Sequence, residues 1–326
     1  MIEILSILCR AILSPYIDEN GKSSIYRCNL GVTTLCLPLI YQKAKVEGRD
    51  FYEVLDYYMD LARDISVRTV KYLSKFKASS NPLVFCEGGF DGGTLGPDDC
   101  IAPVLKRSTI SFGYVSLHEL QLLHNGKPLH EDQTFALEVM EHFNAKLEEY
   151  KKKDGIAAAC YAVPGESLLP RLCEKFKEKF GDIPGVTDRG YFSNSFHLHV
   201  SADVTPIEKI DIEDQFKNLS KAGRITHVRF PDDSNFEGIV AITRYAMAKG
   251  LYLGLNWAQN HCYTCGTHYY GNDSVEAEED PCPNCGSIDI IKIRRMSGYL
   301  GLSHTTTGKT KFNDGKMKEI RDRKNM

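Results

Sequence analysis

Four cysteines in the C-terminal part of the chain constrain its fold more than any other feature. Two residues separate Cys262 from Cys265 and Cys282 from Cys285, and sixteen residues separate the two pairs. This spacing lets two short turns offer four thiolates to one tetrahedral ion. Two disulfides are disfavoured in a reducing compartment, and the evenly paired spacing disfavours an iron–sulfur cluster. We therefore predict a structural Zn²⁺ ribbon with no open coordination position.

Composition narrows the class of protein further. The 326 residues include 40 Lys and Arg against 43 Asp and Glu, and 42% are hydrophobic, which is typical of a globular protein. A net charge of −3 gives no electrostatic reason to expect nucleic acid as a partner. Apolar runs are shorter than the ~18–20 residues that span a bilayer, and the first eight residues lack the basic start of a signal peptide. The other seven cysteines are scattered. We expect a cytoplasmic protein without a membrane partner.

Hydrophobic periodicity predicts strands that alternate with helices. Apolar residues at three-and-four spacing indicate helices over residues 50–77, 131–153, 168–176 and 236–249. Short β-rich runs indicate strands over residues 108–116, 156–163, 196–200, 225–230 and 251–257. This order predicts an α/β fold with much parallel pairing.

The segment that follows the four cysteines carries a family resemblance. Arg294 and Arg295 lead into Met-Ser-Gly-Tyr-Leu-Gly with Gly298 at its centre, and a Phe-Asn-x-Gly-Lys-x-x-Glu-Ile tail ends near Arg323. Together with the ribbon, these segments resemble the C-terminal end of the anaerobic (class III) ribonucleotide reductases, which are glycyl-radical enzymes. The resemblance implies that Gly298 stores the radical. Glycine suits this role because a Cα radical is delocalised only when it can flatten, although an isolated glycine is far more often an ordinary turn residue.

The N-terminal end of the chain supports the same resemblance. Leu8-Cys9-Arg10 is similar to the Gly-Cys-Arg segment of the family, with leucine in place of glycine. The resemblance implies that Cys9 becomes a transient thiyl radical and removes the 3′-hydrogen of the ribose. Sulfur–hydrogen and glycyl carbon–hydrogen bonds are of comparable strength, so a hydrogen atom can pass either way. The alternative is a small buried apolar side chain.

Further segments imply a substrate pocket. Asn29, in an Asn-Leu-Gly segment, resembles the asparagine that lines the pocket of the family. Glu166 and Ser167 lie in a Pro-x-Glu-Ser segment, where Glu166 is our candidate acid or base for loss of the 2′-hydroxyl and Ser167 a candidate substrate contact. Glu166 could equally be a carboxylate at a helix start. His197 and His199 are two residues apart, so on a strand they would lie on the same sheet face. We interpret His197 as a substrate-positioning residue rather than a metal ligand.

The resemblance also implies how the chain is divided into domains. Residues 1–257 would form the C-terminal half of a ten-stranded α/β barrel, 258–292 the zinc ribbon, and 293–326 the glycyl-radical loop and tail. Family members are about twice as long, so we expect a split or truncated subunit that lacks the ATP cone and allosteric half. It would need an N-terminal partner chain or a homodimer. An enzyme active alone, a non-catalytic module that docks onto or repairs a full-length partner, and a nucleic-acid-binding ribbon stay open.

The family chemistry implies further partners. A radical-SAM activating enzyme with a 4Fe–4S cluster would generate the radical on Gly298. The substrate would be a ribonucleoside triphosphate, and the reductant either formate or a thioredoxin-like dithiol, between which the residues do not choose. The reaction would take place in the cytoplasm, that of the host if a phage encodes the chain.

Overall fold

The computed structural model describes residues 5–7, 11–13, 16–17, 23–24, 27–89, 95–272, 280–308 and 312–326. The chain divides into two compact units. The first comprises Met1–Tyr114, Leu137–Val163 and Asn218–Arg224, and the second comprises Val115–Ala136, Pro164–Lys217 and Ile225–Met326.

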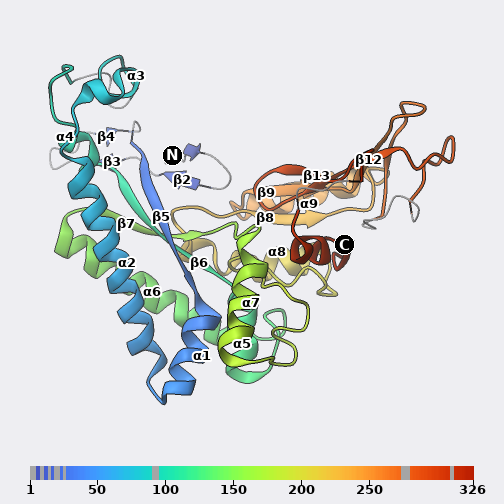
Figure 1. Cartoon of the computed structure of the whole chain (residues 1–326), viewed down its shortest axis with the longest axis horizontal. Coiled ribbons are helices and arrows are strands. Elements are labelled where there is room, and N and C mark those ends of the chain that lie inside the picture. Colours follow the sequence, from blue (N-terminus) through green and yellow to red (C-terminus); the bar gives the residue numbers. More distant parts are fainter. Residues whose placement is uncertain are drawn as a thin grey trace. The chain divides into compact units, whose positions relative to one another are not determined.

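The first unit combines short strands with two long helices (Figure 1). Its strands are β1 (Leu5–Ile7), β2 (Ala11–Leu13), β3 (Tyr16–Ile17), β4 (Ser23–Ser24), β5 (Asn29–Cys36), β6 (Thr109–Val115) and β7 (Ala157–Ala162). Its helices are α1 (Leu37–Glu47), α2 (Phe51–Leu73), α3 (Pro82–Phe85), α4 (Ala102–Leu105) and most of α6 (Thr134–Asp154), with 3-10 turns at Ala78–Ser80 and Lys217–Leu219.

Helix α2 illustrates how local sequence determines where a helix begins and which face it buries. Asp50 caps its N-terminus by accepting a hydrogen bond from the amide of Glu53 at 3.0 Å. Residues at helical spacing along one face, including Val54, Leu55 and Met59, are fully buried. The predicted helix is thus confirmed from Phe51 to Leu73, four residues short of its expected C-terminal end.

The three-stranded sheet of the first unit has the order β5-β6-β7, and β6 and β7 are parallel. Every residue of β6 is buried, as expected of a strand covered on both faces. Helices α2 and α6 lie side by side (Figure 1), joined where Nε of Arg63 donates to Asp154 at 2.6 Å and the hydroxyl of Tyr150 donates to Asp60 at 2.7 Å. The predicted strands at 108–116 and 156–163 are confirmed.

The second unit contains shorter helices and a β-rich C-terminal part. Its helices are α5 (Leu117–Asn125), α7 (Leu168–Phe180), α8 (Pro206–Asp214), α9 (Phe236–Ala248) and α10 (Asp314–Arg321). Its strands are β8 (Thr226–Arg229), β9 (Leu253–Asn256), β10 (Gln259–Cys262), β11 (His268–Tyr270), β12 (Ile290–Arg295) and β13 (Leu300–His304).

Strands β8 and β9 pair in parallel, with α9 as the crossover between them. Helices α8 and α9 and both strands contribute to a buried cluster that includes Ile210, Val228 and Ala246. The strands predicted at 225–230 and 251–257 and the helix at 236–249 are therefore confirmed. The four-stranded antiparallel sheet of this unit has the order β11-β10-β12-β13.

The strand predicted at 196–200 is wrong. Phe196 and Leu198 are buried, but the backbone turns here because the amide of His197 donates to the carbonyl of Asn194 at 2.9 Å. The amide of Leu198 donates to the buried carboxylate of Glu213 at 3.2 Å instead of to a neighbouring strand. An irregular segment whose amides bond to side chains can thus show the alternating burial that is typical of a strand. His197 therefore does not lie on a sheet face, contrary to the prediction from the sequence.

Parallel pairing and mixed α/β content match the prediction. Among the described residues, however, no sheet has more than four strands. No described helix is both long enough and apolar enough to cross a bilayer.

Candidate functional site

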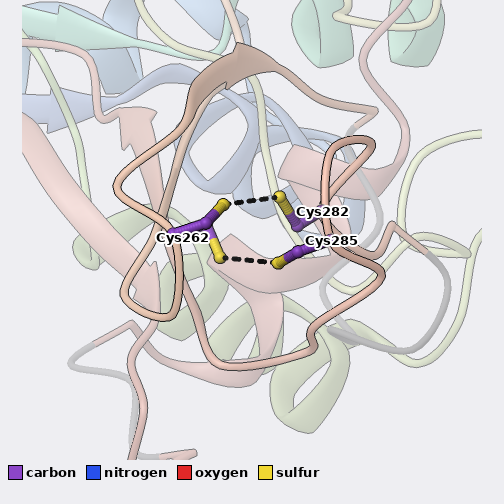
Figure 2. A group of neighbouring side chains, drawn as sticks. Cys262, Cys282 and Cys285 are labelled. Carbon is purple, nitrogen blue, oxygen red and sulfur yellow. Dashed lines mark hydrogen bonds between the residues drawn. The ribbon is translucent and has the colours of Figure 1, made fainter.

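The four cysteines predicted as metal ligands come together in the second unit (Figure 2). Their sulfur atoms all lie within 4.8 Å of one another. The distance is 3.7 Å from Cys262 to Cys285 and 3.6 Å from Cys265 to Cys282. A disulfide requires about 2.05 Å between sulfur atoms, whereas a tetrahedral zinc with Zn–S bonds of ~2.3 Å separates them by about 3.8 Å. The cluster therefore fits four-coordinate zinc.

Two copies of one backbone turn build the cluster. In each, the glycine after the second cysteine donates its amide to the carbonyl of the first, Gly266 to Cys262 at 2.9 Å and Gly286 to Cys282 at 2.8 Å. Both glycines have left-handed backbone conformations, with φ of 73° and 71°, which explains why glycine stands at these positions. The first turn begins at the end of β10, and the second turn precedes β12. Because β10 and β12 are paired, the sheet fixes the distance between the two turns.

The predicted radical residue lies in the hairpin that follows. Strands β12 and β13 pair antiparallel, with Arg295 opposite Leu300. The four residues between them form a tight loop, closed where the amide of Met296 donates to the carbonyl of Tyr299 at 2.7 Å. Ser297 is buried, and Gly298 is half-buried. The four-cysteine cluster and the candidate radical residue therefore belong to one sheet region, joined by β12.

The carboxylate of Glu166 binds this loop. It accepts hydrogen bonds from the amide of Gly298 at 2.7 Å and from the amide of Ser297 at 3.0 and 3.1 Å to its two oxygens. Charge-assisted bonds to successive backbone amides are among the stronger hydrogen bonds in proteins. Glu166 immediately precedes Ser167 and α7, and these contacts bring two of the predicted residues, Glu166 and Gly298, together.

His197 lies beside the same loop. It lines a cavity of about 90 Å³ together with His227 and Ser297, among others. Nε2 of His227 donates to the carbonyl of Ser297 at 3.0 Å, and Nδ1 of His197 lies 3.3 Å from the carboxylate of Glu213. Burial by itself would raise the pKa of Glu213, but the charges of Lys209 and His197 lower it to about 2. An ionised buried carboxylate therefore orients His197.

His227 was not predicted. Its signal in the sequence was an imidazole within the otherwise mostly apolar run 225–230, which is a feature common to many structural histidines. Its contact with Ser297 distinguishes it from those.

One further predicted residue, Asn29, lies in the first unit. Asn29 begins β5, donates its side-chain amide to the hydroxyl of Ser111 at 2.6 Å and accepts from the amide of Gly31 at 3.1 Å. Burial raises the pKa of the neighbouring Cys28 thiol. Cys9 lies outside the described residues.

Comparison with known proteins identifies the family. The sequence model of the anaerobic ribonucleoside-triphosphate reductases matches residues 2–326. The chain belongs to this reductase family. The anaerobic ribonucleoside-triphosphate reductase of Enterobacteria phage T4 is 35% identical, over 97% of this chain and 52% of the relative. That of Escherichia coli (strain K12) is 32% identical, over 97% of this chain and 45% of the relative. The chain thus spans about half the length of the curated reductases it matches.

Solved structures give the same result for the fold. An anaerobic ribonucleotide reductase superposes with a TM-score of 0.70 at 18% identity, covering 96% of this chain and 47% of that one. The Thermotoga maritima anaerobic ribonucleotide reductase with MES in its active site gives a TM-score of 0.64 at 18% identity, covering 89% of this chain and 46% of that one. The mixed α/β fold is therefore that of the reductase family.

Proposed function

We propose that this chain carries the glycyl-radical part of an anaerobic ribonucleoside-triphosphate reductase, with Gly298 as the radical residue. One observation carries the proposal: Gly298 lies in a tight loop directly after the four-cysteine cluster, and a carboxylate holds its amide. A loop that stores a radical has to present one Cα reproducibly, and backbone anchoring achieves this without a side chain at that position.

The predicted residues take roles in this chemistry. Cys9, as a thiyl radical, would remove the 3′-hydrogen of the ribonucleotide and later return it. Asn29, Ser167 and His197 would contact the substrate, and Glu166 would move the proton when the 2′-hydroxyl leaves as water. Two electrons from formate or a dithiol would complete the reduction.

The four cysteines would hold zinc as a structural ion. Their sulfur geometry supports this assignment, and four thiolate ligands leave no coordination position for substrate. The role of the site is to fold the two turns between β10 and β12 and so to fix the strand that leads into the Gly298 loop.

Activity would also need parts that the described strands do not provide. The matched reductases are about twice as long, and we propose that the strands of residues 1–257 belong to a ten-stranded barrel, completed by the region of those relatives that this chain does not span. A partner polypeptide would supply that region, and a homodimer is the alternative assembly. A radical-SAM activating enzyme would generate the radical on Gly298.

Anaerobic electron paramagnetic resonance tests the proposal. The purified chain would be incubated with the activating enzyme, S-adenosylmethionine and a reductant, both alone and with the N-terminal half of a related reductase. A glycyl doublet is expected that disappears in Gly298→Ala. Gly96→Ala is the matched control, since Gly96 is exposed, is not among the left-handed glycines, and its added Cβ would lie no closer than 3.4 Å to Asp99. A doublet that persists in Gly298→Ala, or no signal in either sample, would refute the proposal.

A further inference from the structure

Glu166 adopts a backbone conformation that a non-glycine residue rarely takes. Its φ is 45°, in the left-handed region, where the Cβ of an L-residue comes too close to the following carbonyl oxygen. Such a conformation persists only when neighbouring contacts impose it. The contacts on either side of Glu166 therefore determine where its carboxylate lies.

Asn194 holds the residue before Glu166. Its side-chain oxygen accepts a hydrogen bond from the amide of Gly165 at 2.7 Å. Asn194 belongs to the irregular segment ahead of His197, whose amide donates to the Asn194 carbonyl. Any Cβ at position 165 would overlap the side chain of Leu169, so glycine is required where this turn packs against α7.

Asn313 holds the residue after Glu166. Its side-chain nitrogen donates to the carbonyl of Ser167 at 3.1 Å. Its side-chain oxygen accepts from the amide of Lys316 at 2.9 Å and so caps the N-terminus of α10. One asparagine thus ties the C-terminal helix to the turn that carries Glu166, using its donor for the turn and its acceptor for the helix.

Helix α10 is firmly seated at this place. Gly315 lies so close to Pro170 of α7 that any Cβ on it would overlap the proline ring. Lys316 is buried, forms an ion pair with Glu319, and is close enough to Glu166 for their charges to interact. The Gly-Lys-x-x-Glu segment of the tail therefore packs against the Glu166 turn.

We propose that Asn194 and Asn313 are positioning residues that hold Glu166 in its left-handed conformation, with its carboxylate against the amides of Ser297 and Gly298. The importance of this arrangement for catalysis rests on the proposed function. The arrangement itself concerns only the resting chain, so it can be tested without the radical.

Asn194 holds the turn through its side-chain oxygen, whereas Asn313 holds it through its side-chain nitrogen. The same substitution therefore has different expected effects at the two positions. Asn→Asp keeps the acceptor that position 194 needs and removes the donor that position 313 needs. It also keeps the helix cap at 313, because aspartate caps as well as asparagine. Asn194→Leu removes the acceptor at 194. Asn235→Asp is the matched control, because Asn235 caps α9 through its oxygen, accepting from Gly238 at 2.9 Å.

Hydrogen exchange of the Gly298 amide in the full chain measures the effect. Selective ¹⁵N-glycine and ¹⁵N-lysine labelling makes this amide and that of Lys316 visible by NMR, and Gly298→Ala and Lys316→Arg assign them. Exchange should become faster in Asn313→Asp and in Asn194→Leu, on the order of five-fold for one lost hydrogen bond. It should stay within two-fold of the wild-type rate in Asn194→Asp and Asn235→Asp, and the Lys316 amide should keep its protection in Asn313→Asp.

Several results would overturn the inference. These are wild-type exchange of Gly298 in Asn313→Asp, an equal acceleration in Asn194→Asp, and a loss of protection at Lys316 that accompanies any change at Gly298. Asn313→Ser, which caps the helix without adding a charge, repeats the test if the aspartate variant does not fold. Because the measurement uses the resting chain, absence of a radical would refute the proposed function and leave this result intact.

Discussion

The four-cysteine cluster and the Glu166 contact with the Gly298 loop are built in opposite ways. Cys262 and Cys285, which meet in the cluster, are 23 positions apart, and each turn closes through its own glycine. Glu166 and Gly298 are 132 positions apart, and their contact depends on α7, β12 and α10 being in place. The first is therefore a local motif that a metal can stabilise, whereas the second is a product of the packing of the whole unit.

This difference predicts that single substitutions will affect the two places in different ways. Loss of one metal ligand should remove the whole local motif at once, because the turns have little other core around Cys262, Cys282 and Ile290. Loss of one contact around Glu166 should weaken the loop in proportion to the hydrogen bond removed.

The largest effect is expected from Cys262→Ser. The bound metal should fall from about one ion per chain to none, because the shell needs all four thiolates and a structural zinc contributes on the order of 10 kcal/mol to its motif. Radical formation should be lost, while α7, α8 and α9 stay folded. Metal analysis, electron paramagnetic resonance and circular dichroism measure these three parts. Cys100→Ser, at an exposed cysteine that is not one of the four in the cluster, should keep both the metal and the radical. An unchanged radical yield after metal loss would contradict the proposed role of the ribbon.

A second prediction concerns the turn that carries Asn194. The buried carboxylate of Glu119 accepts from the amide of Ser193 at 2.8 Å and from its hydroxyl at 2.6 Å. Burial raises the pKa of Glu119 to about 7. An acid whose pKa is higher in the folded state favours folding below its unfolded pKa, and this contribution is lost as the pH rises through about 7. The free energy of unfolding should therefore fall by about 3 kcal/mol between pH 4.5 and pH 8 through this group.

Urea unfolding of the wild type and Glu119→Gln across this range isolates the contribution, because the glutamine variant lacks the titration while zinc binding changes equally in both. The variant should gain stability relative to the wild type as the pH rises. A constant difference between the two proteins would show that folding does not raise the pKa of Glu119.

Glu166→Gln should have a smaller effect. The glutamine keeps one oxygen acceptor and places an NH₂ donor against the backbone amides, at a cost of about 1 to 2 kcal/mol in the closed loop. Exchange of the Gly298 amide should become faster, and the glycyl radical should form in lower yield. Glu174→Gln, at an exposed position on α7, is the control. Wild-type exchange in Glu166→Gln would mean that the loop is held by its own hairpin.

The same contrast explains what the sequence could predict. The cluster was predicted residue by residue because its spacing is itself the geometry. Helix α2 and strands β6 to β9 followed from periodicity. The Glu166 contact could not be predicted, because no local pattern states which backbone amides will meet a carboxylate from a distant turn. The strand predicted at 196–200 failed for a related reason: Glu213, on α8, accepts the amide that strand pairing would have used.

The smallest effects are expected from two threonines beside the cluster, one that joins the turns and one that contacts a cysteine sulfur. The hydroxyls of Thr264 and Ser287 join the two turns at 2.7 Å on the exposed surface, whereas the hydroxyl of Thr267 lies 3.1 Å from the sulfur of Cys265. Thr264→Ala should change zinc affinity less than about two-fold, since an exposed hydrogen bond contributes little. Thr267→Val should weaken it about ten-fold, as for other groups that contact a ligand atom. Competition with a chelator measures both. Equal losses would mean that contact between the turns, rather than support of the ligands, stabilises the cluster, and the ribbon would then resemble the Glu166 site in depending on packing.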